Sequence, residues 1–298
     1  MRITRARVAF GGLFFASALA LVAVSAVVNA QALQRSLRVT VVDQSGNDVP
    51  NLGPADFVVK EDKATREVLR VQPANEPMQI ALLVDDSPAV TQYLRDVRSA
   101  ATAFVTAITS NTPANGAHQI ALVTLSSRPT IKTNYTSDSK ALLKAVNSIL
   151  PQPATHSTLI DGIAEVSEGL SKRHAGRPVI VAIAPEVEDA SFRVYDQVLD
   201  ALSNSGATLY VFGLGGNDPD QRDRSIVLSQ GTANSGGTYD TLLASSALSA
   251  RLVRLAGHLT HQYLVTYARP NSLIPPEHVT VSAAKSGLTA RGTLVKAE

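Results

Sequence analysis

The pattern of hydrophobic and polar positions changes twice along the chain. Short alternating segments rich in β-branched residues predict three strands, at 36–43, 56–62 and 67–71. From residue 78, near-continuous apolar runs predict buried strands at 80–84, 119–125, 179–184 and 208–214. Amphipathic or well-capped segments between and after these runs predict helices at 91–110, 139–150, 158–172, 191–203 and 247–261. This alternation indicates an α/β fold with a doubly wound, mostly parallel sheet flanked by helices.

Further β segments flank this α/β region. Residues 130–136 are expected to form an edge strand, and 236–240 a last short strand. After the final helix, 263–268 and 278–284 again have the composition of strands. Because chain termini often lie close together, we predict that residues 31–77 and 263–298 pair into one small accessory β domain. Residues 78–262 would then form the α/β domain.

The first thirty residues have the layout of a secretory signal peptide. Arg2, Arg5 and Arg7 precede an apolar stretch at 8–28, and small-residue cleavage patterns follow at 28–30 and 30–32. The alternative is an uncleaved N-terminal anchor, since the apolar stretch is long enough to span a bilayer. We favour cleavage, which predicts a secreted or periplasmic protein without a membrane segment.

Charge and composition narrow the choice of partners. The chain carries 27 Lys and Arg against 25 Asp and Glu, and residues 1–30 contain three of the arginines and no acid. The mature chain would therefore have a net charge of −1, which removes the electrostatic argument for a nucleic-acid partner. The absence of cysteine rules out disulfides and thiol chemistry.

The first apolar run ends in Asp85, Asp86 and Ser87. In open α/β sheets, ligands bind just outside the carboxyl ends of the strands. An Asp-x-Ser at that point offers hard oxygen atoms, the donor type that Mg²⁺ and Ca²⁺ prefer. The sequence therefore predicts a candidate site directly after this strand.

Several short motifs occur in a specific order along the chain. They are Asp43-Gln44-Ser45-Gly46, Ala55-Asp56-Phe57, Glu61-Asp62, Gly236-Gly237-Thr238-Tyr239 and Gln262-Tyr263-Leu264-Val265-Thr266-Tyr267. With the α/β pattern between them, they make nearly the whole mature chain resemble the secreted bacterial proteins related to von Willebrand factor A-type domains. This resemblance implies that the α/β region is von Willebrand factor A-like and that the protein binds another protein.

The resemblance also implies a position for a metal-ion-dependent adhesion site. In the family this site uses Asp-x-Ser-x-Ser, a threonine from a second loop and an aspartate from a third, and an acidic group of the partner completes the octahedron. Asp85, Ser87 and Thr158 match, whereas Ala89 replaces the second serine and Pro185 stands where the aspartate is expected. We therefore expect weak Mg²⁺ binding or none, and no other cofactor.

Two interpretations of these loops remain open. In the first, nearby acids partly rebuild a metal site: Asp86, Glu186, Glu188 and Asp189. Alternatively, Asp85, Ser87 and Thr158 are inherited loop scaffolding, with Asp and Ser capping the following helix. In either case we place the partner-binding face at the same loops, including Asp86, Ala89, Pro185 and Glu186.

Other polar motifs favour ordinary structural roles. Residues 213–218 are interpreted as a turn rather than a phosphate loop, and 222–224 as a solvated loop. His258 and His261 suit a helix C-terminus better than a metal site. No hydrolase motif is present. We therefore expect a secreted, non-catalytic protein-binding or adhesion module; the alternatives are a Mg²⁺-dependent adhesion domain with a rebuilt site and an unrecognised hydrolase.

Overall fold

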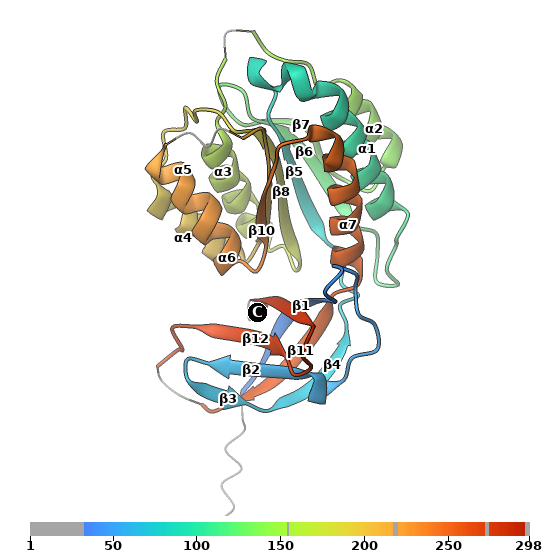
Figure 1. The fold of residues 1–298 in the computed structure, drawn as a ribbon, viewed down its shortest axis with the longest axis vertical. Helices are drawn as coiled ribbons and strands as arrows, with labels where there is room; N and C mark the ends of the chain where they lie inside the picture. Colours follow the sequence, from blue (N-terminus) through green and yellow to red (C-terminus); the bar gives the residue numbers. More distant parts are fainter. Residues whose placement is uncertain (1–32, 154, 217–219, 272–273, 296–298) are drawn as a thin grey trace, which may run out of the picture. The chain divides into compact units, whose positions relative to one another are not determined.

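A computed structural model describes residues 33–153, 155–216, 220–271 and 274–295 (Figure 1). The predicted signal peptide at 1–30 and its cleavage patterns lie outside the described residues. Among the residues described, no helix combines the length and the apolar character needed to cross a membrane.

A six-stranded sheet forms the centre of the α/β region, in the order β10-β9-β8-β5-β6-β7. Its strands are β5 (Gln79–Val84), β6 (Gln119–Thr124), β7 (Thr130–Thr136), β8 (Pro178–Pro185), β9 (Thr208–Leu214) and β10 (Thr238–Leu242). Neighbouring strands are parallel except that β7 runs antiparallel to β6. The predicted parallel sheet and its antiparallel edge strand are therefore confirmed.

Helices cover both faces of this sheet (Figure 1). They are α1 (Leu94–Thr109), α2 (Ser139–Asn147), α3 (Leu159–Lys172), α4 (Tyr195–Ser205), α5 (Arg222–Ile226), α6 (Thr232–Asn234) and α7 (Leu248–Thr260). The chain also forms short 3-10 helices, η1 (Pro54–Asp56), η2 (Pro88–Tyr93) and η4 (Ser245–Ala247), and a π-helical turn, η3 (Val227–Gly231). Ile80 and Leu82 of β5 pack in the core that contains α1, α2 and α7, whereas Ala81 and Leu83 pack in the core with α3 and α4. Burial on both faces explains the continuous apolar run of β5.

Strands from the two ends of the described chain pair with each other. They form the sheets β13-β1-β11-β4 and β12-β2-β3, from β1 (Leu33–Val42), β2 (Phe57–Glu61), β3 (Ala64–Arg66), β4 (Val68–Pro73), β11 (Tyr263–Arg269), β12 (Val279–Ala283) and β13 (Thr289–Leu294). In the register of β1 and β11, Val39 lies opposite Tyr263. The predicted fold class is confirmed, although the sequence pattern missed β3 and β13. The domain boundaries at residues 77 and 263 stay a prediction.

A buried arginine fixes the link between the β segments and the central sheet. The Nη1 atom of Arg177 donates to the Ala74 carbonyl at 2.9 Å, and Nη2 donates to Gln262 Oε1 at 2.9 Å. Gln262 in turn donates to Thr40 Oγ1 at 3.0 Å. Burial, together with the nearby Arg38, lowers the pKa of Arg177 to about 10. This one side chain thus joins the segments that enter and leave the α/β region.

Candidate functional site

The loops that carry the predicted ligand positions form one connected structure at the carboxyl edge of the sheet. Backbone bridges join Ser126 to Ser157 and Ser157 to Asp189, which connects the loops after β6 and β8 with the loop before α3. The amide of Gln152 donates to the Asp86 carbonyl at 2.7 Å, which adds the loop after β5. The structure therefore brings together the three loops that the sequence singled out.

Asp85 and Ser87 each retain an oxygen without a hydrogen-bond partner among the described residues. Asp85 Oδ1 accepts a hydrogen bond from the Ser87 amide at 2.6 Å, but Asp85 Oδ2 and Ser87 Oγ have none. Both side chains are buried. Because a buried polar group without a partner is costly, these two atoms favour an incoming water, cation or hydrogen-bond donor.

The remaining ligand positions add one oxygen. Thr158 Oγ1 donates to the Leu125 carbonyl at 2.5 Å, and its oxygen lone pairs remain available as an acceptor. Ala89 and Pro185 offer no side-chain oxygen. One carboxylate and two hydroxyls leave half or more of an octahedral Mg²⁺ shell to water, which is consistent with weak binding at most. Within the described parts of the chain, no group of three or more His, Asp and Glu side chains is placed to hold a metal.

The capping roles differ from those expected. Ser87 stands at the N-cap position of η2 and Thr158 at that of α3, yet neither side chain makes a capping hydrogen bond. Asp189 takes this role for α3 instead: its Oδ2 accepts from the Ile160 amide at 3.2 Å. Burial raises the pKa of Asp189, while its hydrogen bonds, including those from Ser191, act in the opposite direction. Capping by Ser87 was therefore a wrong prediction.

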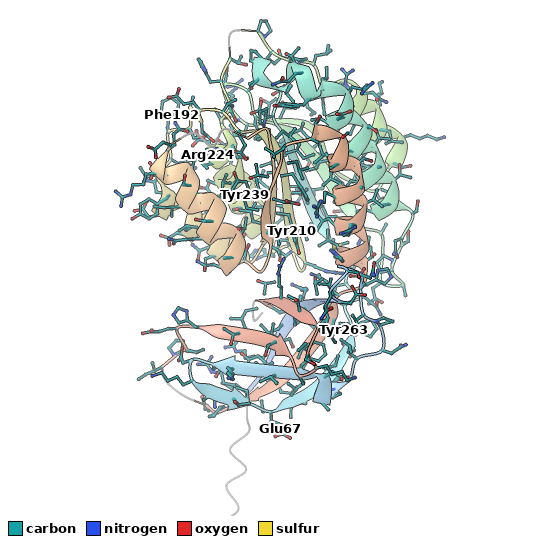
Figure 2. All side chains as sticks on the ribbon, viewed as in Figure 1. Glu67, Phe192, Tyr210, Arg224, Tyr239 and Tyr263 are labelled. Carbon is teal, nitrogen blue, oxygen red and sulfur yellow. The ribbon has the colours of Figure 1, made fainter. Side chains whose placement is uncertain are left out.

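Glu186 is part of a buried polar network. Its Oε2 accepts a hydrogen bond from Arg224 Nη2 at 2.6 Å, and its Oε1 accepts one from the Tyr239 hydroxyl at 2.6 Å. The side chains of Arg224 and Glu186 are 2% and 1% exposed. Figure 2 marks Arg224 and Tyr239 within the α/β region. Both carboxylate oxygens of Glu186 are thus engaged inside the protein.

The prediction that residues 222–224 form a solvated loop is wrong. Helix α5 begins at Arg222, and its first turn directs Arg224 inward to Glu186. Burial opposes the charge of Arg224, but Glu186 and Tyr239 outweigh it and raise the pKa of Arg224. Burial and the hydrogen bond to Glu186 raise the pKa of Tyr239. The network therefore consists of a charged pair and a neutral phenol.

A glycine in β9 makes room for this network. A Cβ atom at Gly213 would lie 1.6 Å from Glu186 Oε1. A glycine inside a strand often marks the close approach of another group. Gly213 is therefore a signal in the sequence that a side chain packs closely against β9 at this position. It does not indicate that this side chain is Glu186 or that Glu186 pairs with Arg224.

The surface of the loop face differs from the predicted set of partner-binding residues. Asp86, Pro185 and Glu186 are buried, and Ala89 is half-buried. Asp86 Oδ1 is also engaged, because it accepts from the Ser126 amide at 2.9 Å. These side chains therefore shape the face from beneath rather than forming its outer surface.

Exposed residues that follow the strands at this edge of the sheet form what we call the rim: Pro88 after β5, Glu188 and Phe192 after β8, and Leu243 after β10. Phe192 is 93% exposed and Leu243 83% exposed. Asp161 fixes the segment that carries Phe192, since its carboxylate accepts from the amides of Phe192 at 3.1 Å and Arg193 at 3.0 Å. The rim therefore presents two large apolar side chains, and hydrogen bonds to Asp161 constrain the backbone of one of them, Phe192.

Comparisons with known proteins agree with this fold. The sequence profile of the von Willebrand factor type A domain matches residues 79–242, more than half of the chain. Among solved structures, proximal thread matrix protein 1 from the mussel byssus has a TM-score of 0.50 at 15% identity, covering 62% of this chain and 49% of that chain. The chain thus spans about half the length of the mussel protein.

Two bacterial structures are also similar. The von Willebrand factor type A protein from Catenulispora acidiphila has a TM-score of 0.49 at 10% identity, covering 89% of this chain and 72% of that one. The vWF domain of the type V pili tip protein Mfa5 from Porphyromonas gingivalis has a TM-score of 0.47 at 11% identity, covering 62% and 96%. A comparison with curated proteins found no match. At these identities the similarity concerns the fold alone.

Proposed function

Since the chain belongs to the von Willebrand factor type A domain family, we propose that it is a secreted, non-catalytic protein-binding module whose loop face works without a bound metal ion. Domains of this family commonly mediate protein–protein interactions. The partner would contact the rim, with Phe192 and Leu243 as apolar anchors. Aromatic side chains at the centre of an interface often carry much of the binding energy.

The proposal that no metal ion is needed rests on one observation: Arg224 and Tyr239 both donate hydrogen bonds to the Glu186 carboxylate. Breaking a buried ion pair leaves an uncompensated charge and costs about 3–5 kcal/mol. An ion at a hundredfold excess over its dissociation constant contributes only about 2.7 kcal/mol. A weakly bound ion would therefore not recover the cost of drawing Glu186 into its coordination shell.

The metal-dependent adhesion domain remains the second candidate, because Asp85 Oδ2 and Ser87 Oγ lack partners among the described residues. In a metal-dependent site these two oxygens and Thr158 would face the ion. In the metal-free module these two oxygens lie beneath the rim, since Asp85 and Ser87 are 0% and 2% exposed, and the partner contacts the rim instead. Dependence of partner binding on a divalent cation therefore separates the two candidates.

Quantitative capture from the extracytoplasmic fraction of the native host tests the proposal. The bait is the mature chain, compared with Phe192→Ser, Leu243→Ser and the control Leu69→Ser. Leu69 is 41% exposed on β4, outside the rim. We expect a protein that the wild type and Leu69→Ser retain in EDTA and that both rim variants lose. Loss of this protein in EDTA would favour the metal-dependent candidate, and equal retention by all baits would contradict binding at the rim.

A further inference from the structure

A cavity separate from the loop face has the character of a ligand site. It has a volume of about 410 Å³ and is lined by residues of β1, β9, β10, α7 and β13. Tyr210, near the start of β9, and Gly236, just before β10, place it toward the amino ends of these parallel strands. Its volume is within the range of small-molecule sites.

Arginine side chains dominate the charge of this cavity. Arg251 and Arg254 come from α7, and Arg291 comes from β13. Asp240 is the only acid among the described residues of the lining, and its Oδ2 lies 3.6 Å from Arg251 Nε. Within the described residues, neither Arg254 nor Arg291 makes an ion pair. Two guanidinium groups therefore remain uncompensated beside one cavity.

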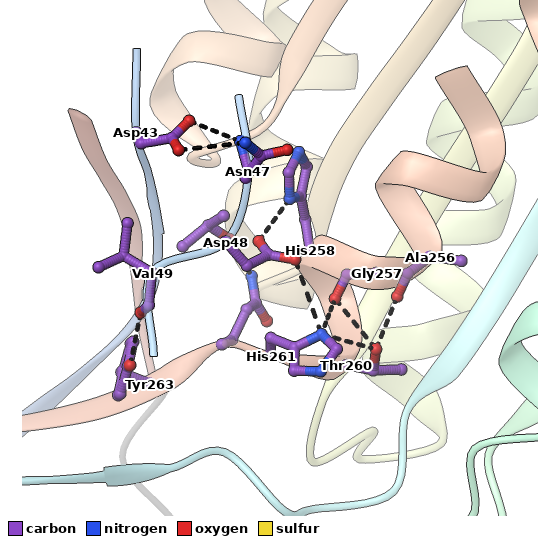
Figure 3. Close-up of polar contacts among 12 residues, drawn as sticks. Asp43, Asn47, Asp48, Val49, Ala256, Gly257, His258, Thr260, His261 and Tyr263 are labelled. Carbon is purple, nitrogen blue, oxygen red and sulfur yellow. Dashed lines mark hydrogen bonds and ion pairs between the residues drawn. The ribbon is translucent and has the colours of Figure 1, made fainter. Parts of the chain in front are cut away.

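Two acids of the loop after β1, Asp43 and Asp48, are engaged by groups other than Arg254 (Figure 3). Asp48 Oδ1 lies 2.5 Å from His258 Nδ1, which joins the loop after β1 to α7. Asp43 Oδ1 accepts from the amides of Ser45 and Asn47 in its own turn. These carboxylates therefore do not neutralise Arg254.

The position of Arg254 is restricted by the same turn. A Cβ atom at Gly46 would lie 3.3 Å from Arg254 Nη1, so the guanidinium packs closely over Gly46. Gly46 has a φ of +79°. A glycine is favoured there both by the left-handed backbone and by the close approach of the arginine. The turn thus keeps one guanidinium at the edge of the cavity.

The lining also contains a buried apolar part. Tyr210, Phe212 and Leu255 contribute to it, and each is no more than 6% exposed. Burial raises the pKa of Tyr210 to about 12, so its hydroxyl stays protonated at neutral pH. A ligand with an apolar body would contact these side chains, while an anionic group would reach the arginines.

We propose that this cavity binds a small organic anion, with a carboxylate or phosphate group held between Arg254 and Arg291 and an apolar body against Phe212. The planar guanidinium group forms paired hydrogen bonds to carboxylate and phosphate oxygens. A region lined by one sign of charge also raises the local concentration of the opposite ion. This site is independent of the proposed protein-binding function.

Calorimetric titration of the mature chain with phenyl phosphate, benzoate, inorganic phosphate and benzylamine tests the proposal. We expect saturable binding of phenyl phosphate or benzoate, weaker binding of inorganic phosphate and none of the cation benzylamine. Arg254→Gln and Arg291→Gln should each weaken binding about tenfold or more, because each removes a charge-assisted hydrogen bond. Arg95→Gln is the matched control, since Arg95 is 95% exposed on α1 outside the cavity.

Thermal melting without ligand shows whether each variant is folded, and the arginine substitutions are expected to preserve the fold because both residues are exposed. Equal affinity for phenyl phosphate or benzoate in the wild type and in a folded variant that combines Arg254→Gln with Arg291→Gln would overturn the proposal. Absence of binding for all three anions, or equal binding of benzylamine, would also overturn it.

Discussion

Glu186 Oε2 and Arg224 Nη2 lie 2.6 Å apart inside the loop face, and both side chains are almost fully buried. The pair connects the loop after β8 to α5, and Tyr239 connects it to β10. The Glu186 carboxylate therefore connects the loop after β8, α5 and β10. The same arrangement directs Glu186 into the protein and leaves Phe192 and Leu243 at the surface.

Replacing Arg224 with methionine should destabilise the protein by about 3–5 kcal/mol, because Glu186 would remain as a buried unpaired charge. Urea unfolding gives the free energy of unfolding of each variant by linear extrapolation. Arg222→Met is the matched control in the same helix; it loses only an exposed contact with the Tyr195 ring, 5.6 Å from the guanidinium carbon, so we expect a change of about 1 kcal/mol or less. Adding Glu186→Gln to Arg224→Met should recover part of the loss. Equal stability of the two single variants would contradict the buried pair.

Gly213→Ala should disturb the same network from the strand side. Its methyl group would lie 1.6 Å from Glu186 Oε1, so the carboxylate or β9 must move. We expect a loss of roughly 1–3 kcal/mol, typical of an overpacked interior. Gly169→Ala is the control, since no atom outside the local helix lies within 4 Å of the added carbon. The comparison is made by urea unfolding; a Gly213→Ala variant as stable as Gly169→Ala would rule out the close approach.

His118 should make stability depend on pH. Its Nδ1 accepts a hydrogen bond from the Met78 amide at 3.0 Å, and burial together with Arg177 lowers its pKa to about 4. The unfolded chain, with a histidine pKa of about 6.5, binds the proton first as the pH falls. The stability that the neutral imidazole contributes is therefore present above about pH 6.5 and is lost as the pH falls toward about 4.

His118→Gln removes this proton uptake, so the urea midpoint of the variant should fall less steeply between neutral pH and pH 4. His278→Gln, at an exposed position, serves as the control. If the variant and wild type lose stability in parallel over this range, His118 does not titrate as described.

Introducing a charge at Val265 should disrupt the β sheet that the chain ends form. Val265 is fully buried in β11, which lies between β1 and β4. Val265→Asp should expose residues 33–73 to proteolysis, because an unpaired charge in this core is costly. Limited proteolysis followed by mass spectrometry identifies the cleaved segments. Ser282→Asp, at an exposed position of β12, should remain as resistant as the wild type. Unchanged cleavage in Val265→Asp would contradict this role of β11.

The sequence predicted those parts of the fold that depend on local patterns. The apolar run of β5 reflects burial on both faces, and Asp138 caps α2 through the amides of Lys140 and Ala141. Glu186 and Arg224 are different, because 38 positions separate them and only the sheet order brings them together. Charged residues around Arg224 give the segment the composition of a solvated loop, so its burial could not be predicted locally. The edge strand β13 has only a weak apolar pattern, with intermediate and exposed positions alone.

Thermal melting during a Mg²⁺ titration tests most directly whether the loop face is independent of metal. The wild-type melting temperature should stay unchanged in millimolar Mg²⁺, because only Asp85, Ser87 and Thr158 offer side-chain oxygens at the five ligand positions. Ala89→Ser combined with Pro185→Asp restores a hydroxyl and a carboxylate and should produce a Mg²⁺-dependent rise. A saturable rise in the wild type that Asp85→Ala abolishes and the exposed control Asp196→Ala retains would contradict the metal-free account.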